Sequence, residues 1–296
     1  HRDEALQVLH FLSDVQLDDG GFEARYLLDG DGTPDGRRRQ ADGAGWALWA
    51  MHEVLADQPD ESLARAELQS LKPLLEGATE FVLDATHDGR DLPAPSADYW
   101  ERREADLTLG TVAPLLAGLR ASADLQPLLG HGAQVLDTAA DALEDRLHDE
   151  FAPTGYLRYP DPGEPSGGVD AATAFLLPPF ASAPVDSDAL TAFDAYQQQA
   201  LRPAGGLAPG AGWKQDGISW TPETALVAYA AAETGRSDEA VHWLDWLNSH
   251  RTTWGSLPEK VLADGAPAGP APLGWSAASM VLAVHALDVA PTRRTP

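Results

Sequence analysis

Carboxylates set among aromatic residues are the side chains of this chain whose types and spacing could do chemistry. The clearest group holds Asp98, Trp100 and Glu101, directly after a proline-rich loop and before a predicted helix. Desolvation beside Trp100 would raise the pKa of Glu101 and keep it protonated near neutral pH, whereas Arg102 and Arg103 would oppose this if they pointed inward. We therefore predict an acid at Glu101. The alternative is an ordinary helix start, with Asp98 as its cap and Glu101 in a capping box.

A second carboxylate, Glu259, lies in a loop between two predicted helices and is flanked in sequence by Trp254 and Trp275. A carboxylate among aromatic rings is a candidate for acid–base chemistry, with the indole rings as flat apolar surfaces. The alternative is a solvent-exposed glutamate that pairs with Lys260.

A third carboxylate, Asp42, opens a predicted helix after an arginine-rich loop. A carboxylate at the inner edge of a loop can accept hydrogen bonds from sugar hydroxyls. From this motif alone, a helix cap is the better interpretation.

Acids, bases and aromatic rings together are what sugar hydrolysis requires. One carboxylic acid protonates the departing oxygen, a carboxylate activates water, and flat apolar faces stack on the sugar. The chain has no cysteine, no His-Glu-x-x-His motif and no glycine-rich phosphate loop, so we expect neither a metal nor another cofactor.

Charge narrows the classes of partner. The chain has 46 Asp and Glu against 20 Lys and Arg, a net charge of -26. Nucleic acid and anionic membrane need a cationic face, so we expect neither as a partner. Because only three of the basic residues are lysines, we interpret the chain as a protein of a halophile, where concentrated salt screens the self-repulsion. The alternative is a merely acidic protein.

Helical periodicity recurs through most of the chain, which has no apolar run long enough to span a bilayer. Leu6, Leu9, His10 and Ser13 fall on one face of a first predicted helix. Ala44, Leu48, Met51, Val54 and Leu55 fall on one face of a second predicted helix. Tyr156 to Tyr159 could form small hairpin arms. Further helices are predicted near residues 62–85, 106–123, 131–149, 168–181, 186–201, 221–235, 236–250 and 273–288. Repeated helical hairpins predict a closed ring or an open solenoid, and periodicity does not distinguish them.

In their order, these segments resemble the catalytic domain of glycoside hydrolase family 15, which includes glucoamylases, glucodextranases and some trehalases. Asp98-Tyr99-Trp100-Glu101 resembles the family's Asp-x-Trp-Glu, and Leu257-Pro258-Glu259-Lys260 its Leu-Pro-Glu-Gln. Weaker matches to family motifs are His1-Arg2-Asp3, Gln40-Ala41-Asp42, Val169-Asp170-Ala171-Ala172 and Pro272-Leu273-Gly274-Trp275-Ser276. The chain departs from the family pattern at Lys260 and at Ala208-Pro209, where an arginine loop is common.

The resemblance implies an all-α, (α/α)6 barrel in a single domain over residues 1–296. Glu101 would protonate the glycosidic oxygen and Glu259 would activate a water molecule on the opposite face of the sugar, with inversion of the product. Such carboxyl groups are about 6.5–9.5 Å apart. The implied sugar contacts are hydrogen bonds from Arg2, Asp3, Asp42 and Asp98, and stacking on Trp100, Trp220, Trp254 and Trp275.

The implied activity is release of glucose from the non-reducing end of α-glucans or maltooligosaccharides. Alternatives within the family are a trehalase and an α-1,6-glucosidase. Outside catalysis, the alternatives are a carbohydrate-binding relative without turnover and a helical scaffold for protein partners. We also expect a cytoplasmic protein from a halophilic archaeon, a first outer helix missing before His1, and a β-sandwich domain upstream.

Overall fold

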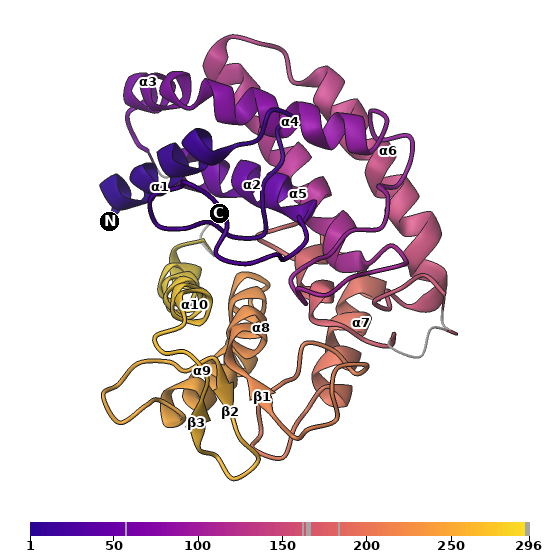
Figure 1. The fold of residues 1–296 in the computed structure, drawn as a ribbon, viewed down its shortest axis with the longest axis vertical. Coiled ribbons are helices and arrows are strands. Elements are labelled where there is room, and N and C mark those ends of the chain that lie inside the picture. The colour runs from indigo at the N-terminus through magenta and orange to yellow at the C-terminus, as the bar shows by residue number, and fades with distance from the viewer. Residues whose placement is uncertain (57, 162, 164–166, 183, 294–296) are drawn as a thin grey trace. The chain divides into compact units, whose positions relative to one another are not determined.

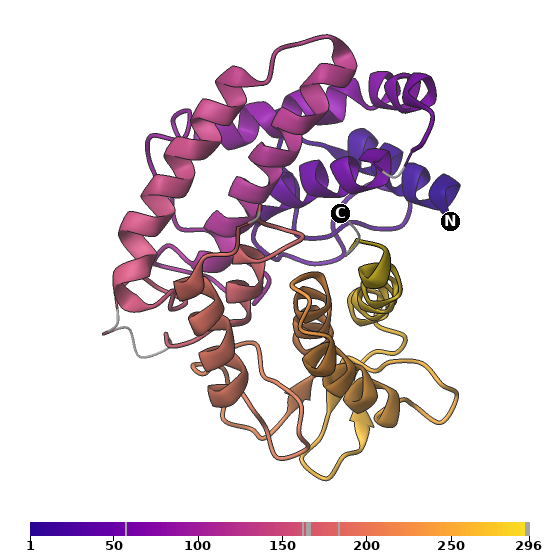
Figure 2. The same cartoon turned by 180° about the vertical axis from the view of Figure 1, so that it is seen from behind.

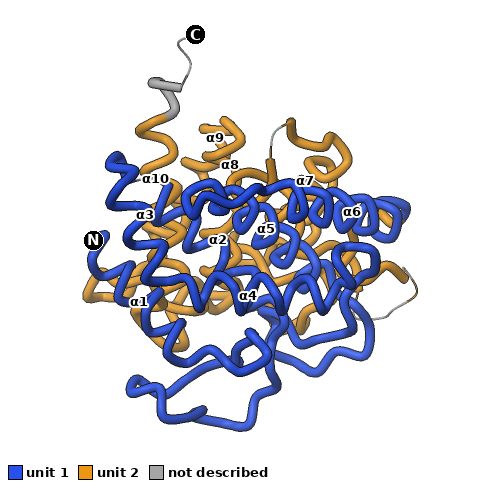
Figure 3. Tube along the Cα trace, turned by 90° about the horizontal axis from the view of Figure 1, so that it is seen from above, with its two compact units in different colours: residues 1–153 blue, residues 154–296 orange. Residues whose placement is uncertain are grey.

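The computed structural model describes residues 1–296 except 57, 162, 164–166, 183 and 294–296. The chain divides into two compact units, residues 1–153 and residues 154–296 (Figure 3). Each unit has its own helices and its own candidate residues, and each is described by itself. The single domain over residues 1–296 stays a prediction.

The first unit is built from helices. They are α1 (Arg2–Val15), α2 (Asp42–Ala56), α3 (Glu61–Ser70), α4 (Lys72–Ala85), α5 (Leu109–Leu125) and α6 (Gln134–Phe151), with 3-10 turns η1 (Gln126–Leu129) and η2 (Ala152–Thr154) (Figure 1). The helix predicted over 62–85 is two helices, because the chain turns at Leu71 and α4 starts anew with Pro73 in its first turn. Asp60 caps α3 by accepting hydrogen bonds from the amides of Ser62 and Leu63.

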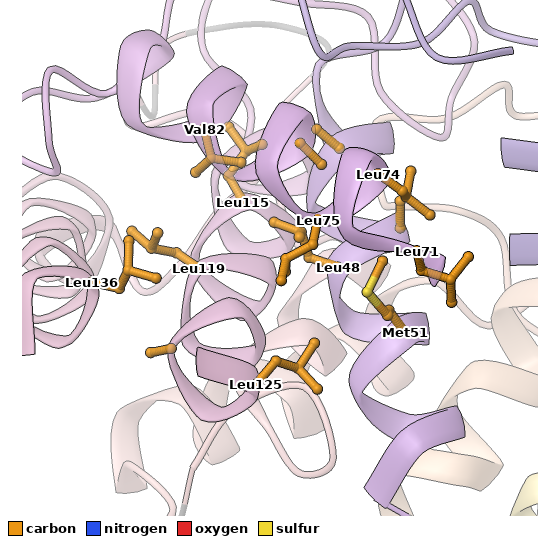
Figure 4. Packing of buried hydrophobic residues seen from close by; sticks show 14 of the residues in the cluster. Leu48, Met51, Leu71, Leu74, Leu75, Val82, Leu115, Leu119, Leu125 and Leu136 are labelled. Atoms are coloured by element: carbon orange, nitrogen blue, oxygen red, sulfur yellow. The ribbon is translucent and has the colours of Figure 1, made fainter. Parts of the chain in front are cut away.

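Close contact between α2 and α5 organises the core of this unit. A side chain on Gly45 would place its Cβ 2.1 Å from the carbonyl oxygen of Pro114, and one on Gly118 would lie 2.5 Å from the Cα of Gly45. The two backbones therefore touch at glycines. Leucines and one methionine of α2, α4 and α5 fill the space around this crossing (Figure 4).

The second unit combines helices with a small sheet. Its elements are η3 (Ala171–Leu176), α7 (Ser187–Gln199), β1 (Ser219–Trp220), α8 (Thr221–Glu233), α9 (Ser237–Ser249), β2 (Lys260–Val261), β3 (Pro267–Ala268) and α10 (Gly274–Arg293) (Figure 1). The strands are antiparallel in the order β1-β2-β3, with Trp220 opposite Lys260. This register joins the start of α8 to the segment that carries Glu259.

Helix α8 is the centre of the second unit. Every residue from Thr221 to Ala232 is buried. Helices α9 and α10 and the turn η3 pack against α8. Figure 1 and the view from behind in Figure 2 both show α8 and α10 side by side. Many of these residues are alanines, which let the neighbouring helices come close. A helix buried on all sides is expected to be apolar all round, so the one glutamate in its first turn is an exception.

Two expectations for this unit were wrong. The helix predicted over 168–181 is only the six-residue 3-10 turn η3, capped by Asp170. Pro178 and Pro179 follow it and prevent an α-helix from continuing. Tyr156 to Tyr159 do not form hairpin arms, because this segment is a turn.

Within the described residues, none of the helices has the length and apolar character needed to cross a bilayer. The same residues contain no group of three or more His, Asp or Glu side chains that could hold a metal ion.

Candidate active site

The turn that carries Glu101 is fixed by the fully buried Asp98. Asp98 Oδ1 accepts a hydrogen bond from the amide of Trp100 at 3.0 Å, and Oδ2 accepts one from Thr108 Oγ1 at 2.8 Å. The amide of Glu101 donates to the Asp98 carbonyl oxygen at 2.7 Å. The segment is a tight turn and not a helix start, since α5 begins after Thr108, which is its cap.

Glu101 projects from this turn with a left-handed backbone, φ 55°, and its side chain is 38% exposed. Both of its oxygens are engaged by guanidinium groups of the loop before α2. Arg25 Nη2 lies 2.5 Å from Oε1, and Arg37 pairs with Oε2. Arg102 lies over the Trp100 ring, 5.8 Å from its centroid, and also pairs with Glu104 at 3.3 Å. Glu101 is thus paired with two arginines that are distant in sequence.

Asp42 belongs to the same group of carboxylates. It is the first residue of α2, and only 3% of it is exposed. Burial, and next the charge of Asp98, raise the pKa of Asp42 to about 8. Trp46 Nε1 donates to Oδ2 at 3.3 Å, while Oδ1 is buried without a hydrogen-bond partner among the described residues. A carboxyl group that is neutral at pH 7 can donate as well as accept a hydrogen bond, which suits recognition of a hydroxyl.

The loop before α2 holds in place the turn over residues 98–101 that carries Glu101. Gln40 forms a β-bridge with Ala97, and its Nε2 donates to the Asp98 carbonyl oxygen at 2.7 Å. Ser96 Oγ accepts a hydrogen bond from the amide of Ala41 at 3.0 Å. These contacts bring the start of α2, with Asp42, close to the turn that carries Asp98, Trp100 and Glu101. The roles of these four residues in sugar binding and catalysis stay predictions.

Arg2 and Asp3 lie elsewhere in this unit, in the first turn of α1. The Arg2 guanidinium pairs with Glu67 of α3 and donates to the carbonyl oxygen of Val54 in α2. Asp3 is exposed. The contacts of Arg2 join three helices, and its role in sugar binding stays a prediction.

Glu259 is held in the second unit by backbone hydrogen bonds on both sides. Its amide donates to Pro270 at 2.9 Å, and its carbonyl oxygen accepts from the amide of Thr221 at 3.1 Å. The carboxylate lies against Gly269, where a Cβ would come within 2.7 Å of Oε2. Lys260 Nζ lies 2.8 Å from that same oxygen. The predicted alternative of a Glu259–Lys260 pair is therefore present, although the glutamate is partly buried.

The three tryptophans predicted to stack on sugar in this unit differ in exposure and surroundings. Trp220, opposite Lys260 in the sheet, has the Lys260 ammonium 4.4 Å from its ring centroid and packs edge-to-face on Trp213 at 5.5 Å. Trp254 is 72% exposed in a turn before Glu259, and Trp275 is an exposed residue in the first turn of α10. An exposed indole is available for a ligand to stack on.

Glu223 is a candidate residue that the sequence did not reveal. It lies in the first turn of α8, is 3% exposed, and has a buried Oε2 without a hydrogen-bond partner among the described residues. Burial, followed by the charges of Asp170 and Glu259, raises the pKa of Glu223 to about 8. Asp170 is itself fully buried and pairs with Arg158 at 3.2 Å. A single glutamate at a helix start reads as a dipole-stabilising residue, and only the packing of α8 shows that it is buried.

Comparisons with known proteins define the class of fold. No protein-family model and no curated protein sequence matches the chain. Among solved structures, it resembles the glucoamylase from Saccharomycopsis fibuligera with a TM-score of 0.75 at 17% identity, over 97% of this chain and 80% of that one. It also resembles a glycosidase variant in complex with glucose, with a TM-score of 0.74 at 20% identity, over 97% and 78% of the two chains. A bacterial glucoamylase complexed with acarbose gives a TM-score of 0.71 at 16% identity, over 94% and 45%.

The chain therefore has the mostly helical fold of glucoamylases, and the predicted all-α class of (α/α)6 barrel type is confirmed. At such low identity the comparison concerns the fold. The function is argued from the site residues.

Proposed function

We propose that the protein is an inverting glycoside hydrolase of α-glucosides, with Glu101 as general acid and Glu259 as general base. The observation that carries this proposal is the setting of two partly exposed carboxylates in a glucoamylase-type fold. Glu101 follows the buried Asp98 and Trp100 in a tight turn, and the charge of Glu259 acts on the buried Glu223. Two carboxyl groups in unlike environments are what this reaction uses.

In the proposed reaction, the glycosidic C–O bond breaks as Glu101 gives its proton to the departing oxygen. Water attacks the anomeric carbon from the opposite face and loses a proton to Glu259, so the released sugar has the inverted configuration. The base must be ionised, and Lys260 Nζ supplies a counter-ion for that form. Asp42, whose Oδ1 has no hydrogen-bond partner among the described residues, would bind a hydroxyl of the terminal glucose, and Trp220, Trp254 and Trp275 would contact its faces. The buried Asp98 and Trp100 would instead position Glu101.

The test is glucose release from maltotriose, isomaltose and trehalose in multimolar potassium chloride. Wild type is compared with Glu101→Gln, Glu259→Gln and a control, Glu61→Gln, whose side chain is exposed on α3. We expect β-glucose as the first product, seen by NMR, and a loss of at least about 10³-fold in kcat for both site variants but not for the control. The preferred disaccharide would identify the linkage.

A second candidate function is sugar binding without turnover. It is favoured by the ion pairs that occupy both carboxylates, with Arg25 and Arg37 at Glu101 and with Lys260 at Glu259. Calorimetric binding of the same sugars by a folded wild type that releases no glucose would establish this function and refute the hydrolase.

A further inference from the structure

Arginines gather around Glu101 in a chain that is otherwise poor in cations. A cavity of about 110 Å³ beside this carboxylate is lined by Arg37, Arg38, Arg102 and Arg103, and Arg25 reaches Glu101 as well. The acidic groups that face these arginines are Glu101 itself, Asp35 and Glu104. Five cations against three anions leave a local charge of +2, in a protein whose net charge is -26.

Two of these arginines form no ion pair among the described residues. They are Arg38 and Arg103, and both are exposed. An acidic protein offers many carboxylates to a surface arginine, so two unpaired guanidinium groups in the same cavity need another explanation. A planar guanidinium fork is the side chain that best recognises phosphate or carboxylate groups.

The place of the cavity in the reaction follows from the proposed function, on which this inference rests. A general acid protonates the oxygen of the leaving group, so the departing part of the substrate lies against Glu101. The cavity at Glu101 is therefore on the side of the leaving group. We propose that this cavity binds an anionic substituent, a phosphate or a carboxylate, on the departing part of an α-glucoside.

The ion pairs of Glu101 fit this proposal. Without a ligand, Arg25 and Arg37 pair with both oxygens of Glu101. An incoming anion competes for the same guanidinium groups and so frees the oxygens of Glu101, which is 38% exposed, to contact the leaving group. A neutral leaving group offers no such exchange. The arginines would thus couple the charge of the substrate to the availability of the general acid.

The test uses disaccharides in neutral and anionic pairs, at one fixed salt concentration. The pairs are trehalose with trehalose 6-phosphate, and maltose with its analogues that carry a 6-phosphate or a 6-carboxylate on the reducing-end sugar. We expect kcat/KM to be at least about tenfold higher for an anionic member than for its neutral twin, since a charge-assisted hydrogen bond changes affinity by about 10- to 100-fold. Comparison of phosphate with carboxylate identifies the substituent.

The variants are Arg38→Gln and Arg103→Gln, with Arg65→Gln on α3 as control. The anionic-to-neutral ratio of kcat/KM should fall about tenfold in each site variant and stay unchanged in the control, with circular dichroism melts showing that each variant is folded. Equal rates on both members of every pair would overturn the inference and leave the hydrolase standing. Arginine-dependent binding of the anionic twin by calorimetry, without turnover of either sugar, would refute the hydrolase but support the anion site. If no sugar is hydrolysed and the anionic sugars bind no more tightly than the neutral ones, both the hydrolase and the anion site are refuted.

Discussion

Glu223 should make the folded protein lose stability as pH rises through the neutral range. Its carboxyl group is 3% exposed, and its Oε2 has no hydrogen-bond partner within the described part of the chain. Burial, with the charges of Asp170 and Glu259, raises the pKa of Glu223 from 4.5 to about 8. The folded state therefore keeps a proton over a range of pH in which the unfolded state has lost it.

The sign of the effect follows from proton linkage. Between pH 4.5 and about 8 the folded state binds more protons at this group, so the free energy of unfolding falls as pH rises, and above about 8 this contribution is constant. One pKa unit corresponds to about 1.4 kcal/mol, so the full range is worth at most about 5 kcal/mol. This is a large fraction of the about 5–15 kcal/mol that stabilises a typical protein.

Glu223→Gln isolates this contribution, because the amide is similar in shape and neutral at every pH. Urea unfolding of wild type and variant, measured at pH 5, 6, 7, 8 and 9 in constant salt, should give similar stabilities at pH 5. The stability of the variant relative to wild type should then rise by several kcal/mol up to pH 8. Glu233→Gln, at the half-buried far end of the same helix, is the control. Parallel pH profiles for wild type and Glu223→Gln would refute the reasoning.

Three other predictions concern stability. The stability of Asp42→Asn relative to wild type should rise with pH between 3.8 and about 8, because burial raises the pKa of Asp42 in the folded state. Urea unfolding of both proteins at several pH values measures this difference. Gly45→Ala should lower the free energy of unfolding by about 1–3 kcal/mol, because its Cβ would clash with Pro114, whereas Gly132→Ala has open space and should be neutral. The thermal midpoint should rise with potassium chloride, since salt screens a net charge of -26; a midpoint independent of salt would contradict the halophile hypothesis.

Helices could be predicted where apolar spacing and burial agree. Of the face predicted from spacing in α2, Ala44, Leu48, Met51 and Leu55 are buried and Val54 is half-buried. Of the face predicted for α1, Leu9 is buried, whereas His10 is exposed. The errors came where backbone chemistry overrides periodicity. A run of apolar residues over 168–181 reads as a helix, but prolines after Leu177 restrict the backbone and leave only a 3-10 turn.

The exposed carboxylates of the candidate site could be picked out from the sequence, but the residues that form ion pairs with them could not. Asp98, Trp100 and Glu101 are neighbours in sequence, and the structure keeps them together. Arg25 is 76 residues from Glu101, and only the folded loop brings it there. Glu223 was missed for a related reason, because its burial depends on the packing of α8, against which η3, α9 and α10 lie.

Charge is balanced differently around Glu101 and around Glu259, and this has a consequence for the proposed activity. Around Glu101 the balance is made by exposed arginines, whereas behind Glu259 it depends on Glu223 staying neutral beside the buried Asp170. When Glu223 ionises near pH 8, a second negative charge appears close to the proposed base. The activity of wild type should therefore change on the alkaline side with an apparent pKa near 8, and Glu223→Gln should abolish that step. If the alkaline limb of kcat/KM is the same in both proteins, the buried carboxyl acts on stability alone.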